Sequence, residues 1–138
     1  NLLYLKARLS KKVEINFNSF IETSAQIPHN QSLIDWVVEN LCKNSVDAMS
    51  GVGKLSIVVS QEKQSIYIDI TDTGKGIAIN DQKAIFDPGY STKKRGWGLG
   101  LALVKRIICE HHKGKVFVLK SKIDFGTTIR ITLPVGHH

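Results

Sequence analysis

The chain has 138 residues, enough for one domain with a single core, and its 42% hydrophobic and 22% charged residues exclude an intrinsically disordered protein. No apolar run approaches the ~18 residues that a membrane-spanning helix needs. The net charge of +7 would suit nucleic acid, but the basic residues are scattered apart from Lys93-Lys94-Arg95 and no nucleic-acid-binding motif accompanies them, so we expect no nucleic-acid partner.

The two ends of the chain are expected to lie outside the main domain. Residues 1–11 look like the last turns of a helix, and because Asn1 is not an initiator Met, we interpret them as the end of an upstream region. Residues 12–135 are expected to form one domain. We interpret residues 136–138 as the remnant of a purification tag without a function.

The first half of the domain is predicted to contain a strand, a long helix and two further strands. Alternating apolar residues predict a strand over 13–17. The helix is predicted from a cap at Ser32 to about Met49, and strands are predicted at 55–59 and 66–70. The apolar stripe expected on the helix comprises Ile34, Val37, Val38, Leu41, Cys42, Ser45 and Met49.

The second half is predicted to contain a short helix over 81–86, a loop over 87–97, a long helix over 99–111 and strands over 115–120 and 127–133. The apolar side of the long helix is expected at Leu99, Leu103, Ile107 and Ile108.

These elements predict an α+β fold, a two-layer α/β sandwich whose mixed sheet is covered on one face by helices. Cys42 and Cys109 both fall at apolar helical positions, so we expect buried free thiols. Two cysteines without metal-ligand spacing give no zinc site.

Three polar side chains share one face of the first long helix. Asn40, Asn44 and Asp47 follow the spacing i, i+4, i+7, apart from the apolar stripe. Asn is a poor helix former, so two of them stacked in mid-helix need a reason. Amide oxygens can enter the oxygen shell of Mg²⁺, which keeps waters and takes substrate phosphates. The alternative is a solvated face carrying the ion pairs Glu39–Lys43 and Lys43–Asp47.

The segment DTGKGI at 72–77 follows the strand predicted at 66–70, which places a carboxylate at the edge of the sheet. Gly74 and Gly76 permit backbone angles and close approaches that other residues forbid. A buried Asp72 carboxylate could accept a hydrogen bond from an exocyclic amine, which would distinguish adenine from guanine. The alternative is a tight turn in which Asp72 is only the turn former.

The segment GWGLGL at 96–101 opens the second long helix. Gly98 and Gly100 would let backbone N–H groups approach an anion at the helix N-terminus. Lys93 and Arg95 lie just upstream and could reach phosphate oxygens. A plain flexible loop remains the alternative, because such a glycine pattern is weak on its own.

Together with the final FGTT at 125–128, these motifs resemble the ATP-binding catalytic domain of sensor histidine kinases. That family belongs to the GHKL superfamily, with gyrase, the heat-shock chaperone and the mismatch-repair ATPases. The likeness covers residues 12–135, and the run IFDPGYSTKKRGWGLGLALVKRII at 85–108 is especially specific. The resemblance implies the Bergerat ATP-binding fold, with ATP and Mg²⁺ as cofactors.

The resemblance also assigns roles to residues of this sequence. Asn40 and Asn44 are implied as catalytic residues, with Asn44 binding Mg²⁺ and Asn40 lining the triphosphate. Asp72 is implied as the adenine-binding residue, and Phe86 is implied to pack under a lid at 90–95. The implied nucleotide-binding set is Asn40, Asn44, Asp47, Asp72, Gly74, Gly76, Ile77, Tyr90, Thr92, Lys93, Arg95, Gly96, Gly98, Leu99, Gly100, Leu101 and Thr127.

The implied activity is that of a protein-histidine kinase, which holds Mg-ATP for γ-phosphoryl transfer to a His on an upstream dimerisation domain. The phosphoryl group would then pass to an Asp of a response regulator. The ATPase branches carry a Glu base at the position of Asn40, so this chain favours transfer over hydrolysis. Many members carry Lys or Arg at the position of Asp47, so no direct Lys–phosphate contact is expected from this helix.

No phosphoacceptor segment is present in the sequence, so the chain alone is expected to bind ATP with little turnover. We expect a monomeric, cytoplasmic piece of a homodimeric protein, and whether that protein is anchored in the inner membrane stays open. The alternatives are an ATPase or protein-serine kinase of the same superfamily, or a degenerate module that only senses nucleotide.

Overall fold

The computed structural model describes residues 12–20, 31–88 and 97–134. The predictions for 1–11 and 135–138, and those for 89–96 within the predicted loop, fall outside these residues.

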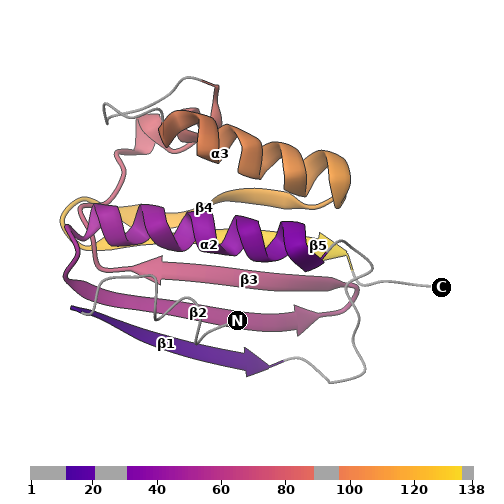
Figure 1. The fold of residues 1–138 in the computed structure, drawn as a ribbon, viewed down its shortest axis with the longest axis horizontal. Helices are drawn as coiled ribbons and strands as arrows, with labels where there is room; N and C mark the ends of the chain where they lie inside the picture. Colours follow the sequence, from indigo (N-terminus) through magenta and orange to yellow (C-terminus); the bar gives the residue numbers. More distant parts are fainter. Residues whose placement is uncertain (1–11, 21–30, 89–96, 135–138) are drawn as a thin grey trace.

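Within the described residues, five strands form one sheet in the order β1-β2-β3-β5-β4 (Figure 1). They are β1 (Val13–Phe20), β2 (Gly53–Glu62), β3 (Ser65–Asp72), β4 (Lys115–Lys122) and β5 (Gly126–Pro134). β1 pairs with β2 in parallel, and the other neighbouring pairs are antiparallel. The sheet is therefore mixed, as predicted.

The two α-helices of the described ranges cover one face of this sheet (Figure 1). α2 (Gln31–Ala48) packs on β2 and β3, and α3 (Trp97–Arg106) packs beside α2. α3 continues into a π-helical turn, η3 (Ile107–His111). The predicted two-layer α/β sandwich is confirmed. No helix within the described ranges is long and apolar enough to cross a membrane.

The core lies between the helices and the sheet and follows from the alternation along the strands. On β3, Ile66, Ile68 and Ile70 are buried, and Ile68 and Ile70 belong to the same core cluster as Leu41 of α2. Asp72 continues the same alternation. Its carboxylate is therefore delivered to the helix-covered face, at the end of the strand.

The opposite face of the sheet carries several polar contacts. Arg130 on β5 donates to Asp69 on β3 through Nε–Oδ1 at 2.8 Å and Nη2–Oδ2 at 2.9 Å. Its guanidinium also lies 4.5 Å from the ring centroid of Tyr67. On the same face, the hydroxyl oxygens of Thr71 and Thr128 are 2.9 Å apart. These contacts are separate from the candidate site on the helix-covered face.

Two predicted helix features are wrong. α2 begins at Gln31, so Ser32 lies inside its first turn and is not the cap. The helix predicted over 81–86 is replaced by two 3-10 turns, η1 (Ile79–Asp81) and η2 (Ala84–Phe86). So short a segment cannot offset the cost of nucleating an α-helix, and tighter turns form instead.

The apolar face of α3 also differs from the prediction. Leu103 is 43% exposed, whereas Val104 is fully buried. Val104, Ile107 and Ile108 follow the spacing i, i+3, i+4, so they form the core-facing stripe and Leu103 lies at its margin. Cys109 is exposed rather than buried, because it lies on the far side of the helix from Val104.

Candidate functional site

The carboxylate of Asp72 is the centre of the candidate site. The residue ends β3 and is 6% exposed. Its Oδ1 atom accepts hydrogen bonds from the backbone N–H of Gly74 at 2.9 Å and of Thr127 at 3.3 Å. The hydroxyl of Ser45 on α2 lies close enough to this carboxylate to lower its pKa. Groups from a loop, a neighbouring strand and a helix therefore surround the Asp72 carboxylate.

The environment of Asp72 has opposing effects on its ionisation. Burial raises the pKa of Asp72, and the hydrogen bonds from Gly74, Ser45 and Thr127 partly oppose that rise. An ionised carboxylate accepts hydrogen bonds and donates none. The site is therefore suited to a ligand that presents an N–H donor.

The glycines in the loop after β3 are required by the backbone around them. A Cβ at Gly74 would lie 2.6 Å from the carbonyl oxygen of Ala48, at the end of α2. Gly76 has φ +78°, and a Cβ there would collide with the carbonyl of Lys122 on β4. The N–H of Lys75 donates to the Ala48 carbonyl at 3.0 Å. The loop is thus held between α2 and the β4–β5 hairpin.

The β4–β5 hairpin is bonded to the same loop. The N–H of Asp124 donates to the carbonyl of Lys75 at 2.9 Å. The N–H of Ile77 donates to Oγ of Ser121 at 2.7 Å, and this Oγ lies 2.7 Å from Oγ1 of Thr127. The loop, β4 and β5 are therefore one hydrogen-bonded unit beside the candidate site.

Asn40 and Gly100 bring α2 and the glycine-rich start of α3 together. A Cβ at Gly100 would lie 3.2 Å from Oδ1 of Asn40. Nδ2 of Asn40 donates to the carbonyl of Trp36 at 3.4 Å. Glu39 pairs instead with Lys43, with Oε1 and Nζ 3.3 Å apart. The predicted amide face and the predicted phosphate-binding segment are therefore adjacent in space.

Asn44 has hydrogen-bonding capacity that the described residues do not use. Its Nδ2 atom is buried and has no partner among them, which is costly unless a ligand or water supplies one. The described residues contain no cluster of three or more His, Cys, Asp or Glu side chains that could hold a metal ion by themselves. A single amide ligand fits Mg²⁺ whose remaining positions are filled by water and phosphate oxygens. Asp47, further along α2, is exposed.

The other predicted residues are distributed as follows. Outside the described residues lie Tyr90, Thr92, Lys93, Arg95 and Gly96. Gly98 and Leu99 lie in the first turn of α3. The side chains of Ile77 and Leu101 are half-buried and pack against the hydrophobic core. Phe86, expected to pack under a lid, is buried in the same core.

Two serines contact the site but are absent from the predicted set. Ser45 is 4% exposed and lowers the pKa of Asp72 from its place on α2, although the sequence places it only on the apolar stripe of that helix. A hydroxyl within an apolar stripe is a usable signal, because a buried hydroxyl needs a partner. Ser121 has no comparable signal, since its contacts depend on the register of β4 against β5.

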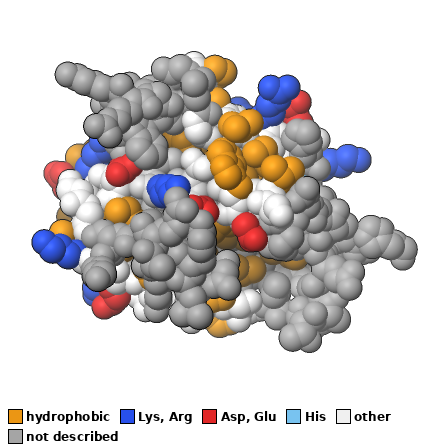
Figure 2. All heavy atoms as spheres, viewed as in Figure 1, with side chains coloured by type: hydrophobic (Ala, Val, Ile, Leu, Met, Phe, Trp, Pro, Cys, Tyr) orange, Lys and Arg blue, Asp and Glu red, His pale blue; other side chains and the backbone are white. Residues whose placement is uncertain are grey.

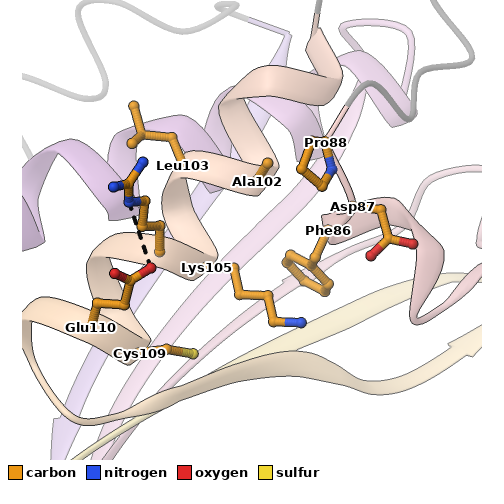
Figure 3. A pocket seen from close by; sticks show the side chains of 9 residues that line it. Phe86, Asp87, Pro88, Ala102, Leu103, Lys105, Cys109 and Glu110 are labelled. Carbon is orange, nitrogen blue, oxygen red and sulfur yellow. Dashed lines mark ion pairs between the residues drawn. The ribbon is translucent and has the colours of Figure 1, made fainter.

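A separate groove of about 560 Å³ is lined by α3, η3 and the segment around η2 (Figure 3). Its lining residues are Phe86, Asp87, Pro88, Ala102, Leu103, Lys105, Arg106, Cys109 and Glu110. Hydrophobic side chains gather over α3 on the face shown in Figure 2. Among the residues that the structure describes, none of the predicted nucleotide-binding residues lines this groove, so it is distinct from the described part of the candidate site.

Comparisons with known proteins identify the family of this chain. Residues 29–137 match the family described as "Histidine kinase-, DNA gyrase B-, and HSP90-like ATPase". The sensor histidine kinase ZraS of Escherichia coli K12 is 35% identical over 127 residues, 92% of this chain and 27% of ZraS. The histidine-protein kinase AtoS of the same organism is 37% identical over 127 residues, 91% of this chain and 21% of AtoS. The chain thus spans about a quarter of the length of these relatives.

Solved structures share the fold. The catalytic domain of the histidine kinase ThkA superposes with a TM-score of 0.80 at 25% identity, covering 96% of this chain and 85% of that one. The mycobacterial sensor histidine kinase MprB gives 0.82 at 23% identity, covering 99% and 91%. The chain therefore belongs to the family of histidine kinase-, DNA gyrase B- and HSP90-like ATPases, and it is a catalytic domain of the type found in sensor histidine kinases.

Proposed function

We propose that this domain binds Mg-ATP at the candidate site and holds it for γ-phosphoryl transfer to a histidine of an upstream dimerisation domain. The observation that carries the proposal is the buried carboxylate of Asp72. Both backbone hydrogen bonds, from Gly74 and Thr127, go to its Oδ1 atom. We assign the other oxygen, Oδ2, to the exocyclic amine of adenine.

The triphosphate end of the site is proposed to lie between Asn44, Asn40 and the start of α3. We propose Oδ1 of Asn44 as the Mg²⁺ ligand, with the ion arriving on the phosphates of ATP. The buried Nδ2 of the same amide has no partner among the described residues, which supports a ligand that presents a hydrogen-bond acceptor, such as a phosphate oxygen or a water of the metal ion. The contact between Asn40 and Gly100 supports a phosphate position at the N-terminus of α3, where backbone N–H groups favour anions. Lys93 and Arg95 are proposed to add positive charge to this end.

Transfer is favoured over hydrolysis by the side chains beside the triphosphate position. An amide such as that of Asn40 cannot act as the general base that would activate a water molecule. The neighbouring carboxylate, Glu39, is committed to Lys43. Catalysis by this domain is therefore proposed to consist of positioning and charge neutralisation, with the acceptor supplied by another domain.

The partners and location are proposed from the relatives. ThkA has been solved in complex with the response regulator protein TrrA, and ShkA in complex with AMPPNP. For this chain we propose a response regulator as the final acceptor, a cytoplasmic location for the domain and a homodimeric kinase as the full-length context. The domain by itself is proposed to be monomeric.

The first test is calorimetric titration of the chain with ATP and GTP in the presence of Mg²⁺, using the wild type and Asp72→Ala. The matched control is Leu103→Glu, which places a negative charge in the separate groove. Binding of ATP but not GTP, lost in Asp72→Ala and retained in Leu103→Glu, is the expected result. If Leu103→Glu loses ATP binding while Asp72→Ala keeps it, ATP binds in the groove and the proposal is overturned.

A second measurement distinguishes the kinase from an ATPase. Radiolabelled ATP is incubated with the domain, with and without a separately supplied acceptor-histidine domain. The kinase proposal expects label on the acceptor and little release of phosphate by the domain alone. Steady phosphate release without an acceptor would support the ATPase alternative instead.

A further inference from the structure

Ser121 joins three parts of the candidate site through a single hydroxyl group. Its Oγ accepts a hydrogen bond from the N–H of Ile77 at 2.7 Å. It donates to the carbonyl oxygen of Gly126 at 3.1 Å. It also lies 2.7 Å from Oγ1 of Thr127, where either hydroxyl could be the donor by distance alone.

Counting protons removes this ambiguity. A serine hydroxyl has one proton to donate and two lone pairs to accept with. The N–H of Ile77 can only donate, and the carbonyl of Gly126 can only accept. All three contacts of Ser121 are satisfied together only if its proton goes to Gly126 and Thr127 donates to Ser121. In the reverse arrangement two oxygen atoms, those of Ser121 and Gly126, would face each other at 3.1 Å without a proton between them.

The consequence is that Thr127 has no proton left for a ligand. Thr127 is 6% exposed and lies directly across from Asp72, with its N–H on Oδ1 of that carboxylate. Its hydroxyl can therefore offer only a lone pair at this end of the site. Together with the carboxylate of Asp72, Thr127 forms an edge that accepts hydrogen bonds and donates none.

We propose that Ser121 is a positioning residue that fixes Thr127 as an acceptor and so makes the site select adenine over guanine. The inference rests on the proposed nucleotide-binding function. The exocyclic amine of adenine carries two N–H donors, which match two acceptors. The oxygen at the same position of guanine would face acceptors only, so that a polar group of the ligand would be buried unpaired.

The test is a double-variant cycle read as the ratio of ATP to GTP affinity. The variants are Ser121→Ala, Thr127→Val and the two combined. In Ser121→Ala the proton of Thr127 becomes available to guanine, and we expect the ratio to fall roughly tenfold. In the double variant the ratio should equal that of Thr127→Val alone, because Ser121 acts only through the hydroxyl of Thr127. Ser121→Thr, which keeps the hydroxyl, should restore the ratio.

Thr71→Val is the matched control. It removes one member of another hydroxyl pair, Thr71–Thr128 at 2.9 Å, on the opposite face of the sheet. It should leave the ratio unchanged. Thermal unfolding checks that each variant is folded, and Ser121→Cys replaces Ser121→Ala if the latter does not fold, because a thiol is a weak donor and acceptor.

The failures of the two ideas are distinguishable. Ser121→Ala could lower the affinities for ATP and GTP equally, or its effect on the affinity ratio could multiply with that of Thr127→Val in the double variant. Either result would mean that Ser121 only supports the loop, and the inference would be overturned. The proposed function survives that result, because the wild type still binds ATP selectively. A folded wild type that binds no ATP overturns both.

Discussion

Asp72 and Thr127 stand directly opposite each other on β3 and β5, and the N–H of Thr127 donates to Oδ1 of Asp72 at 3.3 Å. Gly126, the residue before Thr127, passes so close to the backbone carbonyl of Asp72 that no side chain would fit there. The position of the site carboxylate is therefore fixed by strand pairing, within the central sheet. A ligand that binds Asp72 meets a group whose orientation is already set.

Asp72→Asn is expected to stabilise the fold at neutral pH while it weakens ATP binding. Because burial raises the pKa of Asp72 in the folded state, its stabilising contribution is complete below the unfolded-state pKa and is lost as pH rises through the folded-state pKa. A neutral amide avoids that loss and can still accept from Gly74 and Thr127. We expect the free energy of unfolding at neutral pH to rise by roughly 1 kcal/mol. Urea unfolding at several pH values should show the difference shrinking towards acid pH.

Asp69→Asn is the matched control for this prediction. It is the same substitution on the same strand, but on the face of the sheet away from the helices, where the carboxylate pairs with Arg130. Breaking a partly exposed pair should lower the free energy of unfolding by about 1 kcal/mol or less and leave ATP binding intact. A stability loss in Asp72→Asn equal to that in Asp69→Asn would contradict the expected gain at Asp72.

Gly100→Ala is expected to weaken ATP binding in a folded protein, whereas Gly126→Ala is expected to destabilise the fold. Of the described residues, a Cβ at Gly100 would meet only Oδ1 of Asn40, at 3.2 Å. The helix should therefore fold with the Asn40 amide displaced and with ATP affinity reduced roughly tenfold. Gly126 has φ +129° and faces the backbone of Asp72, so its substitution should cost at least about 2 kcal/mol of stability. Thermal unfolding and ATP titration of both variants decide the matter. If Gly100→Ala and Gly126→Ala lose equal stability, the Asn40 side chain does not move aside for the added methyl group, and the prediction for Gly100 is wrong.

The strands and the helix-covered face of the sheet follow from the sequence, whereas the hydrogen bonds that support Asp72 do not. Asp72 could be predicted because it continues the alternation of an apolar strand and stands directly before a glycine-rich turn. Ser121 could not, because its contact with Thr127 is set by hairpin register, which depends on turn geometry rather than on periodicity. Cys109 is predicted to be buried because it falls at an apolar position of the predicted helix, whereas the core-facing stripe of α3 passes through Val104 and leaves Cys109 exposed.

The two free thiols should react at very different rates. Cys42 is fully buried, and burial with the nearby charge of Glu39 raises its pKa to about 12. Cys109 is exposed in the groove beside α3. Since the thiolate is the reactive form, a maleimide reagent at mildly alkaline pH should modify one thiol quickly and the second only after unfolding. Mass spectrometry of the intact chain, with Cys109→Ser as control, checks this. Rapid double labelling of the folded protein would contradict the burial of Cys42.

Asn44→Ala is expected to remove the effect of Mg²⁺ on ATP binding without harming the fold. The variant deletes an amide whose Nδ2 atom is buried without a partner, so the free energy of unfolding should stay the same or rise by up to about 1 kcal/mol. ATP affinity in Mg²⁺ should fall roughly tenfold, to the value that the wild type shows in a chelator.

Asp47→Asn is the control for that measurement, because Asp47 is exposed and lies further along the same helix. It keeps the shape of the side chain and removes one negative charge near the proposed phosphates, so affinity should stay equal or rise slightly in both conditions. If Asn44→Ala binds ATP in Mg²⁺ as tightly as the wild type, the metal is held elsewhere. In that case the unpartnered amide of Asn44 would serve another group, and the proposed metal ligand would have to be abandoned.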